Sequence, residues 1–279
     1  RCIQMIKEYS DEIIDALQKD FGNRDPKSSF LTEIATTIGV LQHAIKNVDK
    51  WTKDEKRPSN VDRPFFIRML MGFLGSKSYI KYQPLGTVGV ISPWNFPVNL
   101  ILAPLGGIFA AGNRAMIKPS ELTPATSEVT KRMFEAYFDK SEAAVFTGDA
   151  EVGAAFSALP FDHLLFTGGT QIGKKVMKAA SDNLVPVTLE LGGKSPVIVD
   201  ENADLSDVAK KVMRGKTMNA GQICLAPDYL MLPKGKSEEF ANASNEAVSE
   251  MFTDLKYNED YTSVINERHY ERINELVSD

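Results

Sequence analysis

The regular alternation of short β-rich runs with helical segments after Tyr79 most constrains what this chain can fold into. Runs of β-branched and aromatic residues predict strands, and apolar residues at helical spacing between them predict helices. This alternation predicts a parallel, doubly wound α/β sheet with right-handed crossovers, whose ligands bind at the carboxyl ends of the strands. The predicted strands are residues 114–117, 143–146, 163–166 and 186–191, and the helices between them begin near Val98, Pro124, Ala150 and Gln171.

The segments before this alternation predict helices and a hairpin. Apolar residues at helical spacing predict two helices within residues 1–53, interrupted by Gly22 and Pro26. The charged residues 54–62 predict a connector. The predicted hairpin pairs residues 79–83 with 87–91 around a Pro-Leu-Gly turn and forms a bridge of about 77–91.

The strand–helix rhythm restarts after Gly193, which predicts the opening of a second α/β domain. Its predicted elements are a strand at 196–199, a helix at 205–218, a strand at 229–232 and helices at 237–252 and 267–277. The chain is therefore divided into a first domain of residues 1–190 and an incomplete second domain of residues 191–279.

Composition excludes several classes of partner. The 279 residues, 43% hydrophobic and 25% charged, can bury the core of one large or two ordinary domains. A net charge of −5, with interspersed charges of both signs, argues against a nucleic-acid partner. The apolar run 65–75 is too short to span a bilayer and contains Arg68, so we expect no membrane partner and instead a strip that packs on a neighbouring element or subunit.

Cysteine and histidine usage points to a reduced setting without a metal site. Cys2 and Cys224 are the only cysteines, and the three histidines are scattered without metal-ligand spacing. We therefore expect a cytoplasmic protein with no metal centre.

Cys224 has the neighbours of a reactive thiol. An isolated cysteine is usually a small buried hydrophobe, but Asn219, Gly221 and Gln222 are poor core lining and suit a backbone that presents sulfur to a ligand. Glu190, just before a Gly-Gly pair, supplies a carboxylate. A nucleophile and a separate carboxylate base can form and then hydrolyse a thioester.

Three further motifs each have a structural alternative. The glycine-rich run 166–174 (FTGGTQIGK) suits a pyrophosphate at a helix N-terminus, or is only a turn. Lys118 and Glu121 could hold a ribose diol, or form a solvated charged turn. Asn95, between two prolines, could donate a hydrogen bond to an oxyanion or cap a turn.

Together, in this order, these motifs closely resemble the aldehyde dehydrogenase superfamily, from about residue 1 to the end of the chain. Residues 82–86 and 224–229 resemble the class 3 and coniferyl aldehyde dehydrogenase branch in particular. The motifs that carry the resemblance are residues 93–97 (PWNFP), 118–121 (KPSE), 166–170 (FTGGT), 190–194 (ELGGK) and 221–224 (GQIC).

The resemblance implies a role for each matching residue. Cys224 is implied as the nucleophile, Glu190 as the general base, and Asn95 with the backbone N–H of Cys224 as the oxyanion hole. The first domain is implied to bind NAD, with NADP as the alternative, and the second to be catalytic. The implied cofactor-binding residues are Trp94, Lys118, Glu121, Gly148, Gly168, Gly169 and Gly173.

The resemblance also implies what this chain lacks. Many relatives have a serine on the pyrophosphate where this chain has Gly169, which leaves only a backbone N–H there. The family's later Glu-x-Phe-Gly-Pro motif would lie beyond Asp279, so we expect a catalytically incomplete N-terminal part of a homodimeric enzyme.

The expected reaction is oxidation of a small-molecule aldehyde to a carboxylic acid through a Cys224 thioester. Two alternatives stay open: a relative that hands the thioester to coenzyme A, and a dinucleotide-binding chain without turnover. The Glu190 carboxylate counts against the first, because a thiol acceptor needs no base to activate water.

Overall fold

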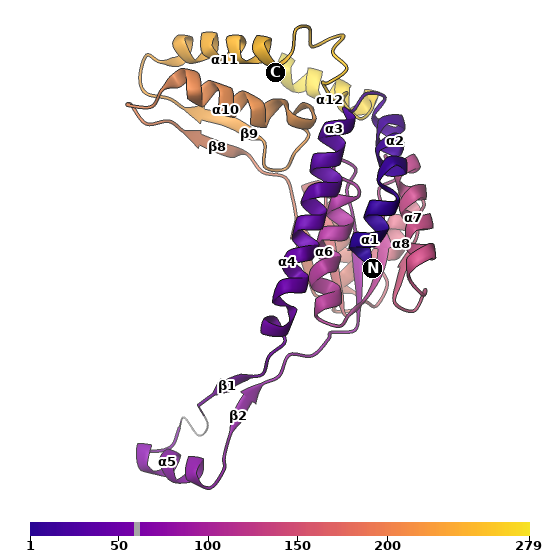
Figure 1. Cartoon of the computed structure of the whole chain (residues 1–279), viewed down its shortest axis with the longest axis vertical. Helices are drawn as coiled ribbons and strands as arrows, with labels where there is room; N and C mark the ends of the chain where they lie inside the picture. Colours follow the sequence, from indigo (N-terminus) through magenta and orange to yellow (C-terminus); the bar gives the residue numbers. More distant parts are fainter. Residues whose placement is uncertain (59–61) are drawn as a thin grey trace.

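The computed structural model describes residues 1–58 and 62–279, and its centre is a parallel sheet covered by helices (Figure 1). Neighbouring strands of this five-stranded sheet are parallel, in the order β5-β4-β3-β6-β7. The predicted doubly wound α/β fold is confirmed, with strand bounds close to those predicted. The strands are β3 (Thr87–Ile91), β4 (Arg114–Lys118), β5 (Ala143–Val145), β6 (His163–Thr167) and β7 (Val187–Glu190).

Four crossover helices begin within a residue of the predicted positions. The chain runs outward from β3 to β5, then returns to the other side of β3 for β6 and β7. The strand order therefore reverses between β3 and β6, and doubly wound sheets form a ligand crevice at such a switch point. The crossover helices are α6 (Asn99–Ala110), α7 (Pro124–Tyr137), α8 (Ala150–Ser157) and α9 (Thr170–Ser181).

The N-terminal helices cover the crossover helices. The chain turns at Gly22, where φ is +74°, and starts a new helix at Pro26, so the predicted interruption is confirmed. Helix α2 packs on α7, and α4 packs on α6 (Figure 1). The N-terminal elements are α1 (Cys2–Glu8), α2 (Ser10–Phe21), α3 (Pro26–Ser29), a π-helical stretch (Phe30–Ala35) and α4 (Thr36–Trp51).

The predicted hairpin is wrong. Strand β2 (Ser78–Ile80) pairs antiparallel with β1 (Glu55–Arg57), while β3 lies between β4 and β6 in the main sheet. Gly86 does not close a hairpin turn, because its N–H donates to the Asn113 side chain and its carbonyl accepts from Arg114 N. The apolar residues of β3 are buried as in a central parallel strand, which decides its partners.

The pairing of β1 with β2 makes a ribbon that projects from the body and carries α5 (Phe65–Phe73) at its far end (Figure 1). Residues 55–57 of the predicted connector 54–62 therefore form a strand, and its residues 59–61 lie outside the described residues. Several apolar side chains of α5 are exposed, including Phe65, Phe66 and Phe73. No helix in the described ranges is long and apolar enough to cross a membrane.

A second, smaller α/β unit, called the second layer below, follows the main sheet along the chain. Strands β8 and β9 are parallel, and α10 and α11 pack together beside them over a core that includes Val199, Leu205 and Phe240. The predicted restart of the strand–helix rhythm is confirmed, whereas the domain boundary at residue 190 stays a prediction. The elements are β8 (Ser195–Ile198), α10 (Leu205–Thr217), β9 (Pro227–Met231), α11 (Ser237–Met251) and α12 (Glu267–Ser278).

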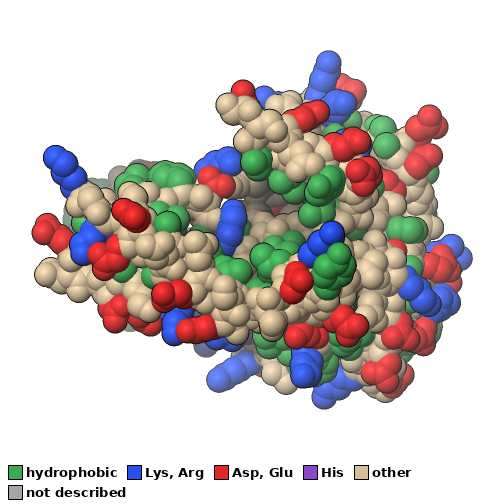
Figure 2. Space-filling model, turned by 90° about the horizontal axis from the view of Figure 1, so that it is seen from above, with side chains coloured by type: hydrophobic (Ala, Val, Ile, Leu, Met, Phe, Trp, Pro, Cys, Tyr) green, Lys and Arg blue, Asp and Glu red, His purple; other side chains and the backbone are tan. Residues whose placement is uncertain are grey.

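Charged side chains of both signs are spread over the face of the molecule seen in Figure 2, without a single basic patch. In the part of the chain that the structure describes, no three His, Cys, Asp or Glu side chains gather as metal ligands would.

Candidate functional site

The residues singled out in the sequence lie at the carboxyl ends of the main-sheet strands. Because all five strands are parallel, the segments that follow them share one edge of the sheet. Cys224 belongs instead to the loop that enters β9 of the second layer. The segments at the shared edge hold Trp94 and Asn95 after β3, Lys118 and Glu121 at and after β4, Gly148 after β5, Gly168 and Gly169 after β6, and Glu190 at the end of β7.

Asn95 joins the loop after β3 to the Cys224 loop. Its Nδ2 atom donates to the carbonyl oxygen of Gln222 at 2.9 Å. Its Oδ1 atom accepts from the backbone N–H of Phe96 at 3.1 Å, which sets which way the amide faces. A side-chain amide has two N–H donors, so the bond to Gln222 uses one of the two donors of Asn95.

The backbone before Cys224 has an unusual conformation. Asn219, Ala220 and Gly221 all have positive φ, at 49°, 52° and 73°. Such values are costly for residues with a side chain, and strained segments of this kind occur at functional sites. Cys224 itself is exposed. Its predicted role of presenting sulfur to a ligand stays a prediction.

Gln222 holds this loop to a distant segment. Its Nε2 atom donates to the carbonyls of Asn219 and Ser263, at 2.9 and 3.0 Å, and its Oε1 atom accepts from Ile265 N at 3.0 Å. The segment around Ser263 is in turn bonded to Asn23, through Ser263 N and the Asn23 carbonyl at 2.8 Å. The sequence marks Gln222 only as a polar neighbour of Cys224, because Ser263 and Ile265 lie 41 and 43 positions later in the chain.

Glu190 ends β7 with its side chain exposed. Its carbonyl oxygen accepts from Gly168 N at 3.0 Å, which ties it to the glycine-rich turn. A Cβ placed on Gly193 would lie 3.6 Å from the carbonyl oxygen of Cys224, so the segment after Glu190 runs beside the Cys224 loop. The structure thus places the carboxylate and the thiol on adjoining backbone segments.

Lys118 and Glu121 form an ion pair at the end of β4. The Lys118 side chain is only 2% exposed, and its Nζ atom lies 3.3 Å from Glu121 Oε2 and 2.8 Å from the Pro119 carbonyl. The Glu121 carboxylate is much more open to solvent. A buried cation beside an accessible carboxylate offers both a donor and an acceptor, which is what a vicinal diol requires.

The glycines of the turn after β6 differ in how closely other side chains pack against them. A Cβ on Gly168 would lie 2.6 Å from the Phe166 ring, and one on Gly173 would lie 2.9 Å from Leu191, so both allow close internal packing. Gly169 has open space around it and is the residue just before α9. The N–H groups at the start of this 12-residue helix therefore face an open position where an anion could approach.

Trp94 packs against His269, a histidine that no motif in the sequence connects with the site. The Trp94 and His269 rings pack edge to face with centroids 5.0 Å apart, and Phe21 lies on the same indole at 6.4 Å. His269 belongs to α12, and its Nδ1 atom is 2.9 Å from Asn266 Oδ1. Burial, with smaller effects from Arg272 and Arg268, lowers the pKa of His269.

A buried ion pair lies behind the Asn95 loop. Arg24 Nη2 is 2.9 Å from Glu33 Oε1, and both side chains are almost completely buried. Arg24 Nη1 also donates to the Asn95 carbonyl at 3.0 Å. Burial lowers the pKa of Arg24 and raises the pKa of Glu33, while the attraction between the two charges acts in the opposite direction. Neither residue showed a local sequence signal of function.

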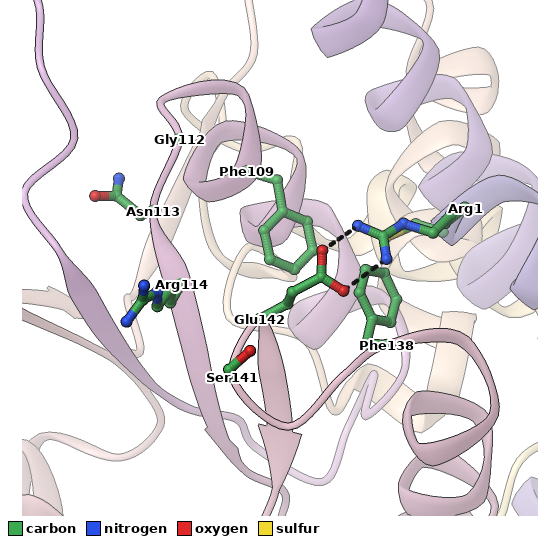
Figure 3. A pocket seen from close by; sticks show the side chains of 9 residues that line it. Arg1, Phe109, Gly112, Asn113, Arg114, Phe138, Ser141 and Glu142 are labelled. Atoms are coloured by element: carbon green, nitrogen blue, oxygen red, sulfur yellow. Dashed lines mark hydrogen bonds and ion pairs between the residues drawn. The ribbon is translucent and has the colours of Figure 1, made fainter.

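A hollow of about 470 Å³ lies elsewhere, at the amino ends of the strands (Figure 3). Arg1 closes one side of it by a two-pronged ion pair with Glu142, at 2.7 Å for each bond, and by stacking on Phe138. None of the predicted site residues lines this hollow. The chemistry-bearing residues lie at the opposite edge of the sheet, so we place the candidate site there.

The aldehyde dehydrogenase family model matches residues 1–279. This chain belongs to the aldehyde dehydrogenase family. It is 53% identical over 279 residues to a probable coniferyl aldehyde dehydrogenase of Caulobacter vibrioides, and 50% identical to a coniferyl aldehyde dehydrogenase of a Pseudomonas species. Each match covers 100% of this chain and 56% of the relative, so the chain spans little more than half the length of these relatives.

Solved structures of the family share the fold. The substrate-bound AldH of Staphylococcus aureus superimposes with a TM-score of 0.90 at 39% identity, over 99% of this chain and 58% of that one. An aldehyde dehydrogenase of Mycobacterium tuberculosis complexed with NAD⁺ gives a TM-score of 0.84 at 25% identity, over 99% of this chain and 55% of that one. The 53% and 50% identities to the two coniferyl aldehyde dehydrogenases confirm the resemblance to that branch inferred from the sequence.

Proposed function

We propose that this chain is the cofactor-binding and thiol-bearing part of an enzyme that oxidises an aldehyde to a carboxylic acid with NAD(P). The observation that carries the proposal is the hydrogen bond from Asn95 Nδ2 to Gln222 O. This bond brings an amide donor from the main sheet to the loop of the exposed thiol, which is the pairing that attack on a carbonyl requires.

In the proposed reaction the Cys224 sulfur attacks the aldehyde carbon, and a C–S bond forms as the carbonyl oxygen becomes an oxyanion. The free N–H of Asn95 and the backbone N–H of Cys224 stabilise that oxyanion. Loss of a hydride from the same carbon leaves a thioester. Glu190 then takes a proton from water, the water oxygen attacks the thioester, and the C–S bond breaks to release the acid and the Cys224 thiolate with which the reaction began.

The edge of the sheet suits a dinucleotide. When bound, NAD(P) accepts the hydride at its nicotinamide ring. In this proposal the diol of the adenosine ribose is held by Lys118 and Glu121, and the pyrophosphate by the open N–H groups at Gly169. Gly168 and Gly173 contribute by letting the turn and α9 pack closely on Phe166 and Leu191. Trp94 and Gly148 lie on neighbouring segments of the same edge and complete the proposed site.

Coniferyl aldehyde is the first substrate to test, because two relatives with 50% identity or more are named for it. We propose NAD as the preferred cofactor and NADP as the weaker one. The full-length enzyme is further proposed to be a cytoplasmic homodimer, in which the exposed apolar side chains of α5 are covered.

The proposal is tested by following NADH formation from coniferyl aldehyde by the full-length enzyme, and by identifying the product. Ferulic acid as the product, with or without coenzyme A, supports it. A product that becomes a coenzyme A thioester would assign the chain to an acylating enzyme instead. NAD binding without turnover of any aldehyde in a panel of aromatic and aliphatic substrates would reduce the function to cofactor binding.

A further inference from the structure

We propose that the buried ion pair of Arg24 and Glu33 is a positioning device that fixes the Asn95 amide for catalysis. The inference rests on the proposed function, because Asn95 is given the oxyanion there. Arg24 and Glu33 are positioning residues, since they act through the loop that carries Asn95 and touch no proposed substrate atom.

Arg24 contacts the loop at a backbone carbonyl and at an aromatic ring. Its guanidinium group donates to the Asn95 carbonyl through Nη1 and to Glu33 through Nη2, at 3.0 and 2.9 Å. The same group lies 5.3 Å from the centre of the Phe96 ring and 4.6 Å from that of Phe21. It therefore contacts the residue that bears the amide and the residue after it.

Glu33 holds the other end of the loop. Its Oε2 atom accepts from the backbone N–H groups of Val98 and Asn99, at 3.1 and 2.8 Å. These are the first groups of α6, where a negative charge is favoured by the helix dipole. The Glu33 carboxylate thus joins Arg24 to the start of α6, and the loop from residue 95 to 99 is held at both ends by one ion pair.

Asn219 makes a third contact with the loop, also at the Asn95 carbonyl. Its Nδ2 atom donates to the Asn95 carbonyl at 3.2 Å, beside the bond from Arg24. Asn219 is buried and is the first residue of the positive-φ run before Cys224. The Asn95 carbonyl is therefore the point where the ion pair and the thiol loop meet.

A buried ion pair contributes little to stability compared with well-packed apolar side chains of similar size, because desolvating both charges offsets their attraction. Positioning gives this pair a role that apolar side chains could not fill. Only a planar guanidinium group can donate at once to a carbonyl and to a carboxylate in fixed directions, and lysine lacks this fork. The geometry predicts that charge alone at position 24 is insufficient.

A double-mutant cycle on the full-length enzyme tests the inference. The variants are Arg24→Lys and the double variant Arg24→Met with Glu33→Gln, which leaves no unpaired buried charge. Each is made with and without Asn95→Ala. Arg132→Gln, which removes an exposed ion pair with Glu12, is the matched control. Circular dichroism and NAD binding show whether each variant folds.

We expect Arg24→Lys to lower kcat about 10-fold and the charge-free double variant to lower it roughly 100-fold, with KM for the aldehyde within about twofold of wild type. In the Asn95→Ala background the same changes should lower kcat further by less than about twofold. The reason is that the effects of substitutions that act through one group are not additive. Arg132→Gln should leave kcat and KM unchanged. Losses of equal size in both backgrounds, or an effect confined to KM, would overturn the inference.

A crystal structure of the charge-free variant supplies a readout that does not depend on activity. We expect the Asn95 Nδ2 atom to move out of hydrogen-bond distance of the Gln222 carbonyl. An Asn95 amide in its wild-type place would show that the ion pair does not position it. If Asn95→Ala alone leaves kcat unchanged, the proposed oxyanion role fails, and the crystal structure still decides whether Arg24 and Glu33 position the loop.

Discussion

The side chain of Asn95 donates a 2.9 Å hydrogen bond to the backbone of Gln222, a residue 127 positions later in the chain. This bond connects the switch point of the main sheet with the loop that presents Cys224. Together with the bond from Asn219 Nδ2 to the Asn95 carbonyl, it joins the segment proposed to stabilise the oxyanion to the segment that bears the sulfur.

Replacing Asn95 by Ala is expected to lower kcat of the full-length enzyme roughly 100- to 1000-fold, about 3–4 kcal/mol, because an oxyanion donor acts chiefly on the transition state. Aldehyde KM should change little. Steady-state kinetics with coniferyl aldehyde provide the measurement. A rise in KM at constant kcat would make Asn95 a residue of the loop structure only.

Glu190→Gln should leave the first burst of NADH largely intact while steady turnover collapses, provided that Glu190 is not also needed to deprotonate the thiol. The physical reason is that the base is needed to activate water and not to form the thioester. Cys224→Ala should abolish both phases, and the 279-residue chain alone should show neither. Rapid-mixing traces of NADH separate the two steps. A full burst from Cys224→Ala would end the assignment of the nucleophile.

Glu121→Gln should narrow the preference for NAD over NADP. The accessible Glu121 carboxylate repels a 2′-phosphate on the ribose that it is proposed to hold, and an amide of the same shape does not. The measurement is kcat/KM for both cofactors in wild type and variant. Equal ratios before and after the change would show that Glu121 does not contact the ribose.

Gln222→Leu should destabilise the protein by about 2–4 kcal/mol, because the partly buried partners of its amide lose their hydrogen bonds. Those partners are the carbonyls of Asn219 and Ser263 and the N–H of Ile265. Urea unfolding of the full-length enzyme measures the decrease in the free energy of unfolding. Gln18→Leu, at an exposed position of α2, is the control and should leave the midpoint nearly unchanged. Equal midpoints for the two variants would contradict the prediction.

Acid should remove stability that neutral His269 gives the folded protein. Burial lowers the pKa of His269 below its ordinary value of 6.5, so the unfolded chain takes up this proton more readily than the folded one. The stabilisation is present above 6.5 and is lost as the pH falls through the folded-state pKa. Unfolding midpoints at a series of pH values below neutrality should therefore fall less steeply for His269→Asn than for wild type. Parallel curves would show that His269 does not contribute.

Much of the fold could be read from local patterns in the sequence. The strands before Lys118, Val145 and Thr167, and the starts of the helices that follow, depend on residue periodicity and on turn chemistry within a few positions. Once the strands are parallel, their carboxyl ends must share an edge. The sequence therefore predicted a parallel sheet with its ligand edge at the carboxyl ends of the strands, and Asn95, Lys118, Gly169 and Glu190 lie at or just after those ends.

The partner of each strand was not a local property. Strand β2 pairs with β1 across α5, and β3 enters the main sheet, because β3 is buried on both faces, with Val88 and Val90 on one and Gly89 on the other. This burial outweighs the short turn at Gly86. The predicted hairpin failed for that reason.

The sequence by itself determined the class of fold, the family and the set of candidate residues, because each depends on neighbouring residues or on short motifs. Only the tertiary structure decided how those residues are held. Arg24 bonds to Asn95, Glu33 to Val98 and Gln222 to Ile265, across 71, 65 and 43 positions of the chain. A hydrogen bond between such residues exists only when packing brings a donor and an acceptor within about 3 Å. No periodicity in the sequence encodes that distance.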